Sequence, residues 1–565
     1  MAPAVKRRAA DATAASLPAS SPSAERVQAA DLDVMHQGRT KVDTPQHEHQ
    51  GAHPRKQQAS PLERLVLRST AHVRANPDAW LTGALVLLGL WTRLYRIRWP
   101  PECVFDEVHF ASFAHHYLNR TYFFDIHPPL AKLTLAAVAK LAGDVPNRDW
   151  YVDKVYPPDS RYYAMRACAG VFGALLPPLG FRIARGMGMS RIAATSVGVF
   201  LLFDMLNLIE ARHILTDSQL IFYSALCIDA FVRLWRTPLA SRARRWAAVR
   251  AGLASGAALS VKWTTLVVPG LFGLESVAGA ALAAEPLEWS TCAIVAATAL
   301  LLYVALWYPH FQILIYNGPG GDFMSAEFQR TLIGRDGYDP QARKPPFLKL
   351  VWQLNKEMLL ANARILDEHQ WQARWHTWPY VGRGLLYWDR WQEGTLDADG
   401  RPLRPHHAMQ IYLIGNPLLF WMCLAAVLGT VAAMPFLLRL IRQRKKRGTS
   451  TDAWERYLRL ATFLLLGYAL GILPYMPIQR STFIYHYLPS LLFAELLFAH
   501  AVLDLPALPS VLQLPLAGIV WIVVFWCFWY FRAWVYGHIA LTADDHEAMR
   551  WIKYTSSVGD NKGWH

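Results

Sequence analysis

The sequence predicts an all-α integral membrane protein that crosses the bilayer many times. Hydrophobic residues make up 53% of the 565-residue chain, and charged residues only 18%. The chain contains 23 Trp, far more than a soluble core of this size needs. Apolar runs close to the ~20 residues that cross a bilayer as a helix recur from Ala79 to the C-terminal region.

We count about eleven such runs, each near the length of one membrane-spanning helix. They lie near residues 79–97, 164–185, 191–209, 214–235, 247–264, 265–284, 289–308, 411–438, 457–475, 482–503 and 513–533. Only Pro269 and Gly270 give a strong signal for a break between the fifth and sixth runs.

The remaining segments are polar. The expected organisation is a tail over 1–75, a transmembrane domain over 76–535 with long loops at 98–163 and 309–408, and a second tail over 536–565. The first tail is rich in Ala, Ser, Pro and Gln, which predicts disorder. In the second loop, apolar residues recur at helical spacing from Phe347 to Leu366, so we expect a helix lying at the membrane interface.

The orientation follows from the basic clusters Arg236–Arg250 and Arg439–Arg447, because short cytoplasmic loops carry excess Lys and Arg. With a cytoplasmic N-terminus, eleven spans place both clusters inside and both long loops outside. Removing one helix from the uncertain fifth and sixth pair would place the second cluster outside. The count of eleven therefore agrees with the charge distribution.

Several function classes lack their signals. The net charge is +15, but the basic residues lie in short loops with no basic, aromatic-rich face for nucleic acid, and anionic lipid headgroups are the more natural partners. The six Cys show no CxxC spacing, so neither a disulfide framework nor a metal cluster is indicated. The N-terminus lacks the apolar region of a signal peptide. The sequence also has no Gly-rich nucleotide loop, no HExxH and no Gly-x-Ser-x-Gly.

Three carboxylates and two imidazoles follow the first apolar run. Asp106 and Glu107 are adjacent, so they cannot share one helical face, and we expect one to act as a general base and the other to orient it. A solvated loop or structural salt bridges would be the alternative. Asp125 and His127 precede Pro128-Pro129, which fixes the local backbone, although His127 would serve equally well as a turn cap.

Cations inside apolar runs are costly and usually face a cavity or an anion. Arg166 lies just inside the second run, where snorkelling is an alternative explanation, and Lys262 lies deep in the fifth. A phosphate is the natural partner for such a pair. We expect no metal ion there.

Two further charged clusters map to the same outer face. Glu210, Arg212, His213 and Asp217 lie at the hairpin between the third and fourth runs, where they either cap helices, with Asp217 pairing with Arg212, or line the same cavity. Arg480 and His486 open the tenth run and add phosphate or hydroxyl partners. An outer-face site without a nucleotide loop predicts a donor delivered through the membrane.

These motifs resemble the protein O-mannosyltransferases, membrane glycosyltransferases of the GT-C type. The resemblance covers most of residues 90–500. Its motifs are Phe105–Phe110, Tyr122–Leu133, Gly318–Phe328 (GPGGDFMSAEF), the stretch from Asn362 to Trp388, and Arg480–Pro489 (RSTFIYHYLP). The chain departs from family members that carry a β-trefoil of MIR repeats, because too few residues separate Gly318–Phe328 from Phe347.

The resemblance implies transfer of mannose from dolichyl-phosphate-mannose to Ser or Thr of proteins entering the endoplasmic reticulum lumen, with inversion in one displacement. It implies that Asp106 is the catalytic base, Glu107 its partner and Arg166 a donor-binding residue. Lys262 and Arg480 are our additions on physical grounds. No cofactor is implied besides the lipid donor substrate, and a homodimer or a heterodimer with a paralogue is expected. The loop containing Trp371, Trp375, Trp378 and Trp388 is a candidate acceptor groove.

Three other functions remain open from the sequence. A related polyprenyl-phosphate-sugar transferase would use another acceptor, such as a glycan or a lipid A-like molecule. A transporter would place its charges near the bilayer midplane and would use broken helices in pseudo-symmetric positions. A non-catalytic paralogue would act as a partner, although the intact Asp106-Glu107 pair argues against it.

Overall fold

A computed structural model describes residues 76–145, 151–278, 287–365, 368–392 and 407–553, and the backbone of 555–557 and 560–562. The tail expected over 1–75 lies outside the described residues.

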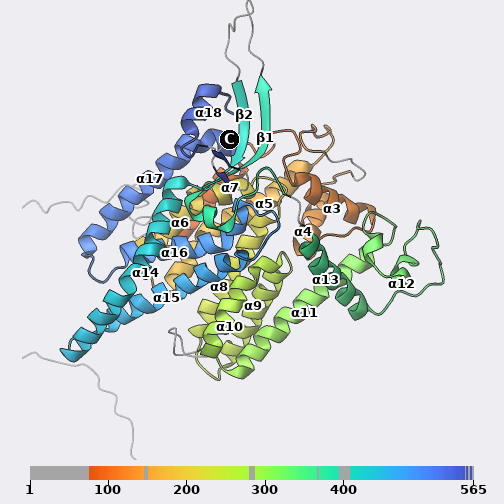
Figure 1. Cartoon of the computed structure of the whole chain (residues 1–565). Coiled ribbons are helices and arrows are strands. Elements are labelled where there is room, and N and C mark those ends of the chain that lie inside the picture. Colours follow the sequence, from red (N-terminus) through yellow and green to blue (C-terminus); the bar gives the residue numbers. More distant parts are fainter. Residues whose placement is uncertain are drawn as a thin grey trace, which may run out of the picture. The chain divides into compact units, whose positions relative to one another are not determined.

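The described chain is largely helical (Figure 1). The helices of the apolar runs are α2 (Pro77–Leu94), α5 (Tyr162–Gly186), α6 (Arg191–Phe203), α7 (Met205–Glu210), α8 (Asp217–Trp235), α9 (Arg242–Leu259), α10 (Val267–Ala278), α11 (Trp289–Ile313), α14 (Pro417–Lys446), α15 (Asp452–Ile472), α16 (Leu488–Leu503) and α17 (Ser510–Tyr536). Each predicted run therefore coincides with a helix, and α6 and α7 share one run.

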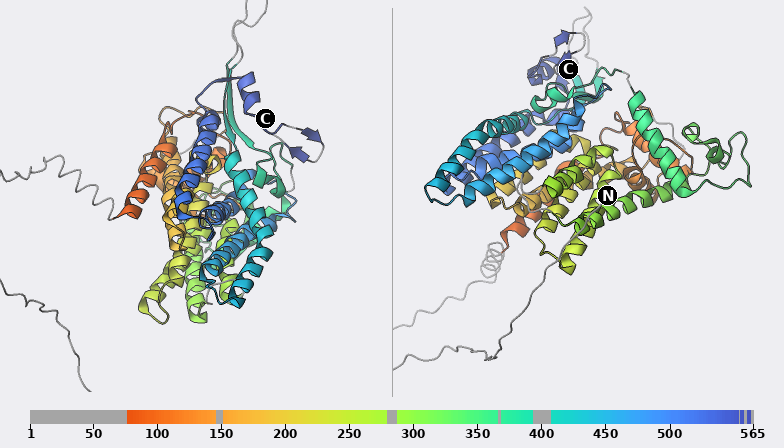
Figure 2. Two further views of the ribbon diagram at one scale, coloured as in Figure 1. Left: turned by 90° about the vertical axis from the view of Figure 1, so that its left-hand side faces the viewer. Right: turned by 60° about the horizontal axis from the view of Figure 1, so that its bottom comes forward.

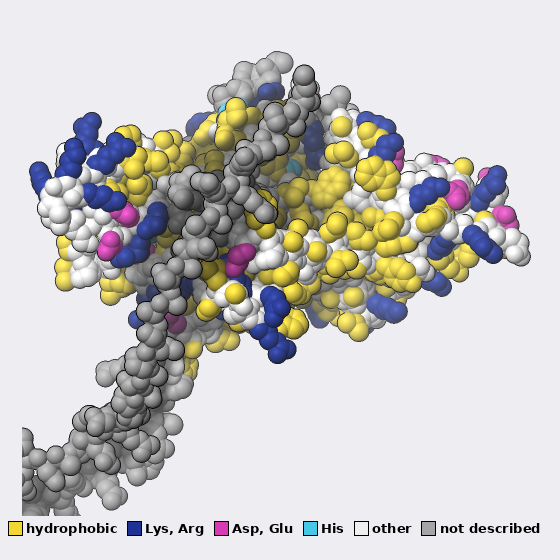
Figure 3. All heavy atoms as spheres, turned by 90° about the horizontal axis from the view of Figure 1, so that it is seen from below, with side chains coloured by type: hydrophobic (Ala, Val, Ile, Leu, Met, Phe, Trp, Pro, Cys, Tyr) yellow, Lys and Arg dark blue, Asp and Glu magenta, His cyan; other side chains and the backbone are white. Residues whose placement is uncertain are grey.

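Six helical segments are long and apolar enough to cross a membrane in the described part of the chain. They are Tyr162–Gly186, Trp289–Ile313, Pro417–Lys446, Asp452–Tyr475, Ile484–Leu503 and Ser510–Tyr536. Their outer surfaces carry many exposed apolar side chains, including Leu301 on α11 and Ile522 on α17. In Figure 3 hydrophobic side chains spread across the centre of the face, with Lys and Arg toward both its left and right edges. The chain is a multi-pass membrane protein.

The third run is interrupted at Asp204, which ends α6 and caps α7. Its buried carboxylate accepts the backbone N–H groups of Leu206 and Asn207. Asp204 has extended backbone dihedrals, so the helix cannot continue through it. The interruption turns the chain into the hairpin that carries Glu210 and Asp217.

The break between the fifth and sixth runs is confirmed, but it lies earlier than Pro269. The helix α9 ends at Leu259, and the 3-10 helix η1 (Trp263–Leu266) separates it from α10. Lys262 between them is extended, with φ −150° and ψ 145°. This break frees Lys262 from a continuous helix.

The polar regions hold the helices α3 (Glu107–Asn119), α4 (Leu130–Leu141), η3 (Gly321–Phe323), α12 (Ala326–Gln329), α13 (Phe347–Arg364), η4 (Trp375–Tyr380) and α18 (Ala543–Met549). The 3-10 helices η5 (Leu473–Tyr475) and η6 (Ile484–Tyr487) lie at the end of the ninth apolar run and near the start of the tenth. In Figure 1 α3, α4, α12 and α13 lie together on the right of the bundle. The helix α13 confirms the prediction from Phe347 onwards, and it buries Leu350, Leu354 and Met358.

The expectation of an all-α fold is wrong in one respect. The strands β1 (Leu385–Gln392) and β2 (His407–Leu413) form an antiparallel pair, and β3 (Leu541–Thr542) joins β2. A second pair is formed by β4 (Thr555–Ser557) and β5 (Asp560–Lys562). Aromatic and branched residues favour this pairing, as in Trp388 opposite Ile411. The left view of Figure 2 shows β1 and β2 beside the C-terminal segment.

The sheet also moves the start of the eighth apolar run. Residues 411–413 belong to β2, and α14 begins only at Pro417. Asn416 caps α14, because its side-chain oxygen accepts the N–H of Leu419 at 3.2 Å. Its own amide donates to the carbonyl of Val524 in α17 at 2.9 Å.

Candidate active site

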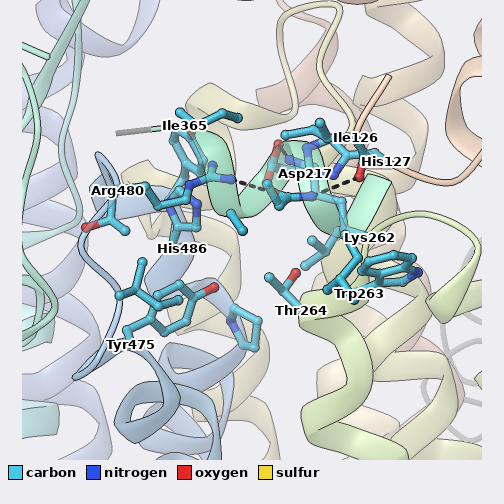
Figure 4. Close-up of a pocket in the computed structure, with 18 of the residues that line it drawn as sticks. Ile126, His127, Asp217, Lys262, Trp263, Thr264, Ile365, Tyr475, Arg480 and His486 are labelled. Carbon is cyan, nitrogen blue, oxygen red and sulfur yellow. Dashed lines mark hydrogen bonds and ion pairs between the residues drawn. The ribbon is translucent and has the colours of Figure 1, made fainter. Parts of the chain in front are cut away.

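A cavity of about 530 Å³ opens where the first long loop (residues 98–163, called loop one below), the α9–η1 break and the segment before α16 meet. Its polar lining residues include Asp106, His127, Asp217, Lys262, Asn362, Arg480 and His486. Figure 4 shows Lys262 and His127 on one side of the hollow and Arg480 and His486 on the other. Six of the ten predicted site residues therefore share one cavity: Asp106, His127, Asp217, Lys262, Arg480 and His486.

Asp106 sits at the N-cap position of α3, and its carboxylate makes no hydrogen bond or ion pair with a described residue. Burial raises the pKa of Asp106 to about 6, even though the charges of His109 and Lys262 lower it. A carboxylate with a pKa near 6 is suited to accept a proton close to neutral pH.

The residue before Asp106 has a strained backbone. Phe105 has φ 44°, a left-handed conformation that costs a non-glycine residue free energy. Its ring stacks on Tyr387 of β1, with centroids 4.8 Å apart, and this contact holds the conformation. Tyr387 in turn donates a 2.6 Å hydrogen bond to Glu210. The strand β1 therefore helps to position Asp106.

Glu107 is fully buried and points away from the cavity. Its oxygens accept two hydrogen bonds from Arg166, both at 2.7 Å. They also accept the Val104 N–H at 2.9 Å, the Tyr156 hydroxyl at 2.8 Å and the Ile214 N–H at 2.8 Å. Burial alone would raise its pKa, but the Arg166 charge and its hydrogen bonds lower the pKa of Glu107 well below its ordinary value. These contacts suit an anchor rather than a base.

Arg166 does not line the cavity. Besides Glu107, its guanidinium donates to the carbonyls of Pro100 at 2.7 Å and Glu102 at 2.8 Å. Arg212 is also turned away, because it donates to the carbonyls of Arg93 and Tyr95 at the end of α2. Arg166 thus fastens the loop over residues 98–163 to α5, and Arg212 fastens the hairpin after α7 to the end of α2.

The predicted pair between Arg212 and Asp217 is wrong. Asp217 pairs instead with Lys262, whose Nζ lies 2.7 Å from its Oδ2. A sequence-local pairing fails here because the break after α9 brings Lys262 to the start of α8. The Lys262 Nζ also lies 5.6 Å from the Tyr485 ring centroid.

Arg480 lies on the facing wall. Its Nη1 donates to the Asn362 side-chain oxygen of α13 at 2.6 Å. Among the described residues Arg480 forms no ion pair, so its positive charge is not neutralised by a neighbouring carboxylate. The His486 ring lies parallel to Trp378, with centroids 6.0 Å apart, and beside Tyr485.

Asp125 and His127 are held by a residue that the sequence reasoning did not single out, Lys132 of α4. Lys132 pairs with the Asp125 carboxylate and donates to the His127 carbonyl at 2.6 Å. Burial lowers the pKa of His127 to about 3, so its imidazole is neutral at neutral pH. The sequence does contain a signal for Lys132, because this residue lies one helical turn after Pro128-Pro129, inside the motif Tyr122–Leu133.

The Gly318–Phe328 segment packs against the backbone that leads to Asp125. A Cβ on Gly320 would lie 2.0 Å from the Phe124 nitrogen and 2.2 Å from the Phe123 carbonyl carbon. Only glycine allows this approach. The two polar regions are therefore locked together beside the cavity.

The loop containing Trp371, Trp375, Trp378 and Trp388, the candidate acceptor groove, contributes less exposed aromatic surface than expected. Trp378 and Trp388 are buried and cannot form the surface of a groove, so that part of the prediction is wrong. Trp375 does line a second hollow of about 340 Å³. That hollow shares Tyr475, Arg480 and Thr482 with the main cavity.

An apolar hollow of about 740 Å³ adjoins the cavity on its other side, between α9, α10 and α11. Trp263 lines both. In Figure 4 Trp263 lies next to Lys262. Among the described residues no group of three or more His, Cys, Asp or Glu is arranged to hold a metal ion.

Two family models match the chain over well more than half of its length. Residues 83–315 match the model described as dolichyl-phosphate-mannose-protein mannosyltransferase. Residues 347–555 match the C-terminal four-transmembrane region of protein O-mannosyltransferase. The fully described stretch between α12 and α13 holds no β-trefoil, as expected.

Individual relatives agree with the family models. Dolichyl-phosphate-mannose–protein mannosyltransferase 6 of Candida albicans is 30% identical over 285 residues, which are 45% of this chain and 34% of that protein. Protein O-mannosyl-transferase 2 of Danio rerio is 28% identical over 322 residues, which are 54% of this chain and 41% of that protein. The chain thus spans less than half the length of these curated relatives.

A solved structure shares the fold. A chain of the Saccharomyces cerevisiae protein O-mannosyltransferase Pmt1–Pmt2 complex bound to the sugar donor matches with a TM-score of 0.74 at 18% identity. The match covers 86% of this chain and 93% of that chain. Fold and family models agree along most of the sequence, and the chain belongs to the protein O-mannosyltransferase family.

Proposed function

We propose that this chain transfers mannose from dolichyl-phosphate-mannose to Ser or Thr hydroxyls of secretory-pathway proteins. Family membership supports the proposal, and one observation carries it. The unpartnered carboxylate of Asp106 shares a cavity with Lys262 and Arg480, so a base and anion-binding groups face the same space.

The reaction is a single displacement at the anomeric carbon of the donor. The acceptor hydroxyl gives its proton to Asp106 while its oxygen bonds to that carbon. The bond between the anomeric carbon and the phosphate oxygen breaks, and dolichyl phosphate leaves with the electron pair. The new bond forms on the face opposite the leaving group, so the configuration inverts.

Arg480 is the strongest candidate to hold the leaving phosphate. Its neutral partner Asn362 fixes the guanidinium without cancelling its charge. The Lys262 charge is shared with Asp217, so Lys262 contributes a weaker field and His486 a hydrogen bond. Preorganised cations of this kind stabilise charge that develops in the transition state.

The two hollows that meet at Trp263 support a donor with a polar head and a long apolar chain. The sugar phosphate fits the cavity with Asp106, and the polyprenyl chain fits the hollow between α9, α10 and α11. A soluble nucleotide sugar would leave this apolar hollow without an occupant.

Glu107 and Arg166 act as positioning residues in this proposal. Their buried pair fixes the backbone on the N-terminal side of Asp106. Asp125 and Lys132 do the same for His127, whose neutral imidazole hydrogen-bonds the sugar or acceptor.

We further propose a GT-C type bundle of eleven spans in the endoplasmic reticulum membrane. The N-terminus is cytoplasmic, and the cavity opens to the lumen, as do residues 98–163, 309–408 and 536–565. The five helices α2, α6, α8, α9 and α10 would then cross together with the six longer segments. Membrane lipids surround the bundle, and basic loops at its cytoplasmic end meet their headgroups.

A dimeric assembly is part of the proposal. The related yeast structure is described as a Pmt1–Pmt2 complex, which supports a homodimer or a heterodimer with a paralogue. No nucleic acid partner is proposed.

The test incubates purified full-length protein with dolichyl-phosphate-mannose and a Ser/Thr-rich peptide, and measures added hexose by mass spectrometry. Asp106→Asn should reduce turnover at least about 10²-fold, because a general base contributes 10²–10⁴-fold. Donor binding should persist. Arg480→Gln should instead weaken donor binding.

The matched control is Asp336→Asn, which changes an exposed carboxylate in the second polar region. It should turn over like the wild type. Undiminished turnover by Asp106→Asn would refute the base assignment. Transfer to a glycan or lipid acceptor but not to the peptide would replace the proposed acceptor class.

A further inference from the structure

A second polar cavity of about 790 Å³ lies away from the candidate active site. It is formed by the α5–α6 turn, the end of α8, the second half of α10, the start of α15 and the end of α16. None of its lining residues belongs to the cavity that contains Asp106. The arginines of the α8–α9 connection and of α15 place it at the basic end of the bundle.

An unpartnered carboxylate faces this cavity. Glu275 of α10 is 1% exposed, and neither of its side-chain oxygens has a hydrogen-bond partner among the described residues. A buried carboxylate without a partner is destabilising, because its hydration is lost and nothing replaces it. A cationic or hydrogen-bond-donating ligand would therefore satisfy the Glu275 carboxylate.

A buried donor lines the same cavity. The indole N–H of Trp235 at the end of α8 also has no partner. The other acid in the lining, Asp504, already accepts the N–H of Ser190 at 3.2 Å and lies 3.6 Å from the His500 ring nitrogen. Among the described lining residues, the buried side-chain atoms without a hydrogen-bond partner are thus the two Glu275 oxygens, the Trp235 indole nitrogen and the His500 Nδ1.

Three arginines are among the residues that line this cavity. Arg236, Arg456 and Arg459 are exposed, and none forms an ion pair with a described carboxylate. Arginine binds phosphate through several parallel hydrogen bonds. An anionic group is therefore expected at the mouth, beyond the buried carboxylate.

The walls between these polar groups are apolar. They include Val232 of α8 and Leu460 and Phe463 of α15. Because the cavity lies among membrane-spanning helices, these walls suit a hydrocarbon chain better than water.

We propose that this cavity binds one phospholipid whose headgroup carries both a phosphate and a primary ammonium group. The arginines hold the phosphate, Glu275 accepts hydrogen bonds from the ammonium, and the apolar walls contact an acyl chain. A headgroup with only a negative charge would leave Glu275 unpaired and repelled. A quaternary ammonium could not donate a hydrogen bond to it. The proposal does not depend on the transferase reaction.

The test measures binding to delipidated full-length protein by thermal unfolding in detergent. A ligand that binds only the folded state raises the unfolding midpoint. The probes are phosphatidylethanolamine, phosphatidylcholine, phosphatidylglycerol and soluble phosphoethanolamine. We expect phosphatidylethanolamine to raise the midpoint more than the other two lipids.

Two variants locate the effect. Glu275→Gln should weaken phosphatidylethanolamine binding about tenfold or more, because the ammonium group then donates to a neutral amide oxygen and no longer to a carboxylate. The double variant Arg456→Gln/Arg459→Gln removes exposed charges without touching the core, so it tests the site even if Glu275→Gln fails to fold. The control Arg442→Gln removes an exposed arginine of α14 outside the cavity and should bind like the wild type.

Each outcome decides the matter. Stabilisation by phosphatidylethanolamine alone among the probes assigns the ligand to the membrane. Stabilisation by soluble phosphoethanolamine as well assigns it to the headgroup, from either source. Equal stabilisation by the three lipids, stronger stabilisation by phosphatidylglycerol, or unchanged binding in the double variant overturns the proposal.

Discussion

Asp106 and Glu107 are neighbours in sequence but have opposite environments. Asp106 faces a cavity without a partner, whereas Glu107 accepts five hydrogen bonds inside the protein. The start of α3 between them turns the two side chains apart. One carboxylate is left reactive and the other is fixed as an anion.

The raised pKa of Asp106 predicts the pH dependence of transfer. The base acts only when deprotonated, so kcat/KM should fall as the pH drops through about 6 and level off above it. An unperturbed Asp would place this fall in kcat/KM near pH ~3.9. Initial rates between pH 4.5 and pH 8 at low donor concentration measure the pH at which kcat/KM falls. A fall that occurs only below about pH 4.5 would contradict the raised pKa of the buried Asp106.

Glu107→Gln should destabilise the protein strongly. The change leaves the buried Arg166 charge without its counterion, which costs about 3–5 kcal/mol in comparable pairs. The measurement is the thermal unfolding midpoint in detergent.

The matched control is Glu327→Gln, because Glu327 pairs with Lys349 on the surface, where both side chains are about half exposed. An exposed pair is worth ~0–1 kcal/mol, so this variant should unfold like the wild type. Equal midpoints for both variants would show that the Arg166 pair is not an anchor.

At the scale of elements, the cavity depends on places where regular structure stops. Lys262 enters it because α9 ends at Leu259, and Arg480 enters it from the segment before α16. The close packing of Gly320 against Phe123 and Phe124 sets the position of the segment that carries Asp125.

Gly320→Ala should reduce activity without removing any reactive group. The added Cβ would collide with backbone atoms that cannot swing away, so loop one must shift. We expect a lower kcat/KM and a lower unfolding midpoint. Gly429→Ala in α14 is the control, because nothing lies within 4 Å of its Cβ position. Similar behaviour of the two variants would show that the contact is not required.

The apolar runs in the sequence predicted the helices well, because a membrane-spanning helix requires one long apolar run that is easily recognised. It missed β1 and β2, since their residues lie in a polar region where short alternating segments give a weak signal. The contents of the cavity were predicted in part. Lys262 was recognised because a cation inside an apolar run is costly. Its pairing with Asp217 depends on the helix ending at Leu259, before the Pro269-Gly270 signal, and no local pattern marks that position.

For the whole molecule, the two polar cavities belong to opposite ends of the bundle. The helix α10 starts directly after η1, which carries Trp263 of the first cavity, and ends near Glu275 of the second. Eleven spans predict that the first end faces the lumen and the second the cytoplasm.

Cysteine labelling in sealed microsomes tests this orientation. An impermeant maleimide added outside should modify Ser450→Cys, in the exposed basic loop, and should spare Asp336→Cys until the membrane is permeabilised. The control is the wild type, whose six cysteines are buried or half-buried. Labelling of both sites from the same side would contradict the single crossing by α14 between them and would require an even number of crossings instead.

The segment after α17 reaches back to the opposite end of the sequence. Trp99 donates to the carbonyl of Gly537 at 2.7 Å, and the His546 ring lies 3.1 Å from the carbonyl of Ala408 in β2. The strand β2 supports β1, whose Tyr387 braces Phe105. Cutting the chain after Tyr536 should therefore lower the proposed activity, although every residue that lines the cavity with Asp106 would still be present.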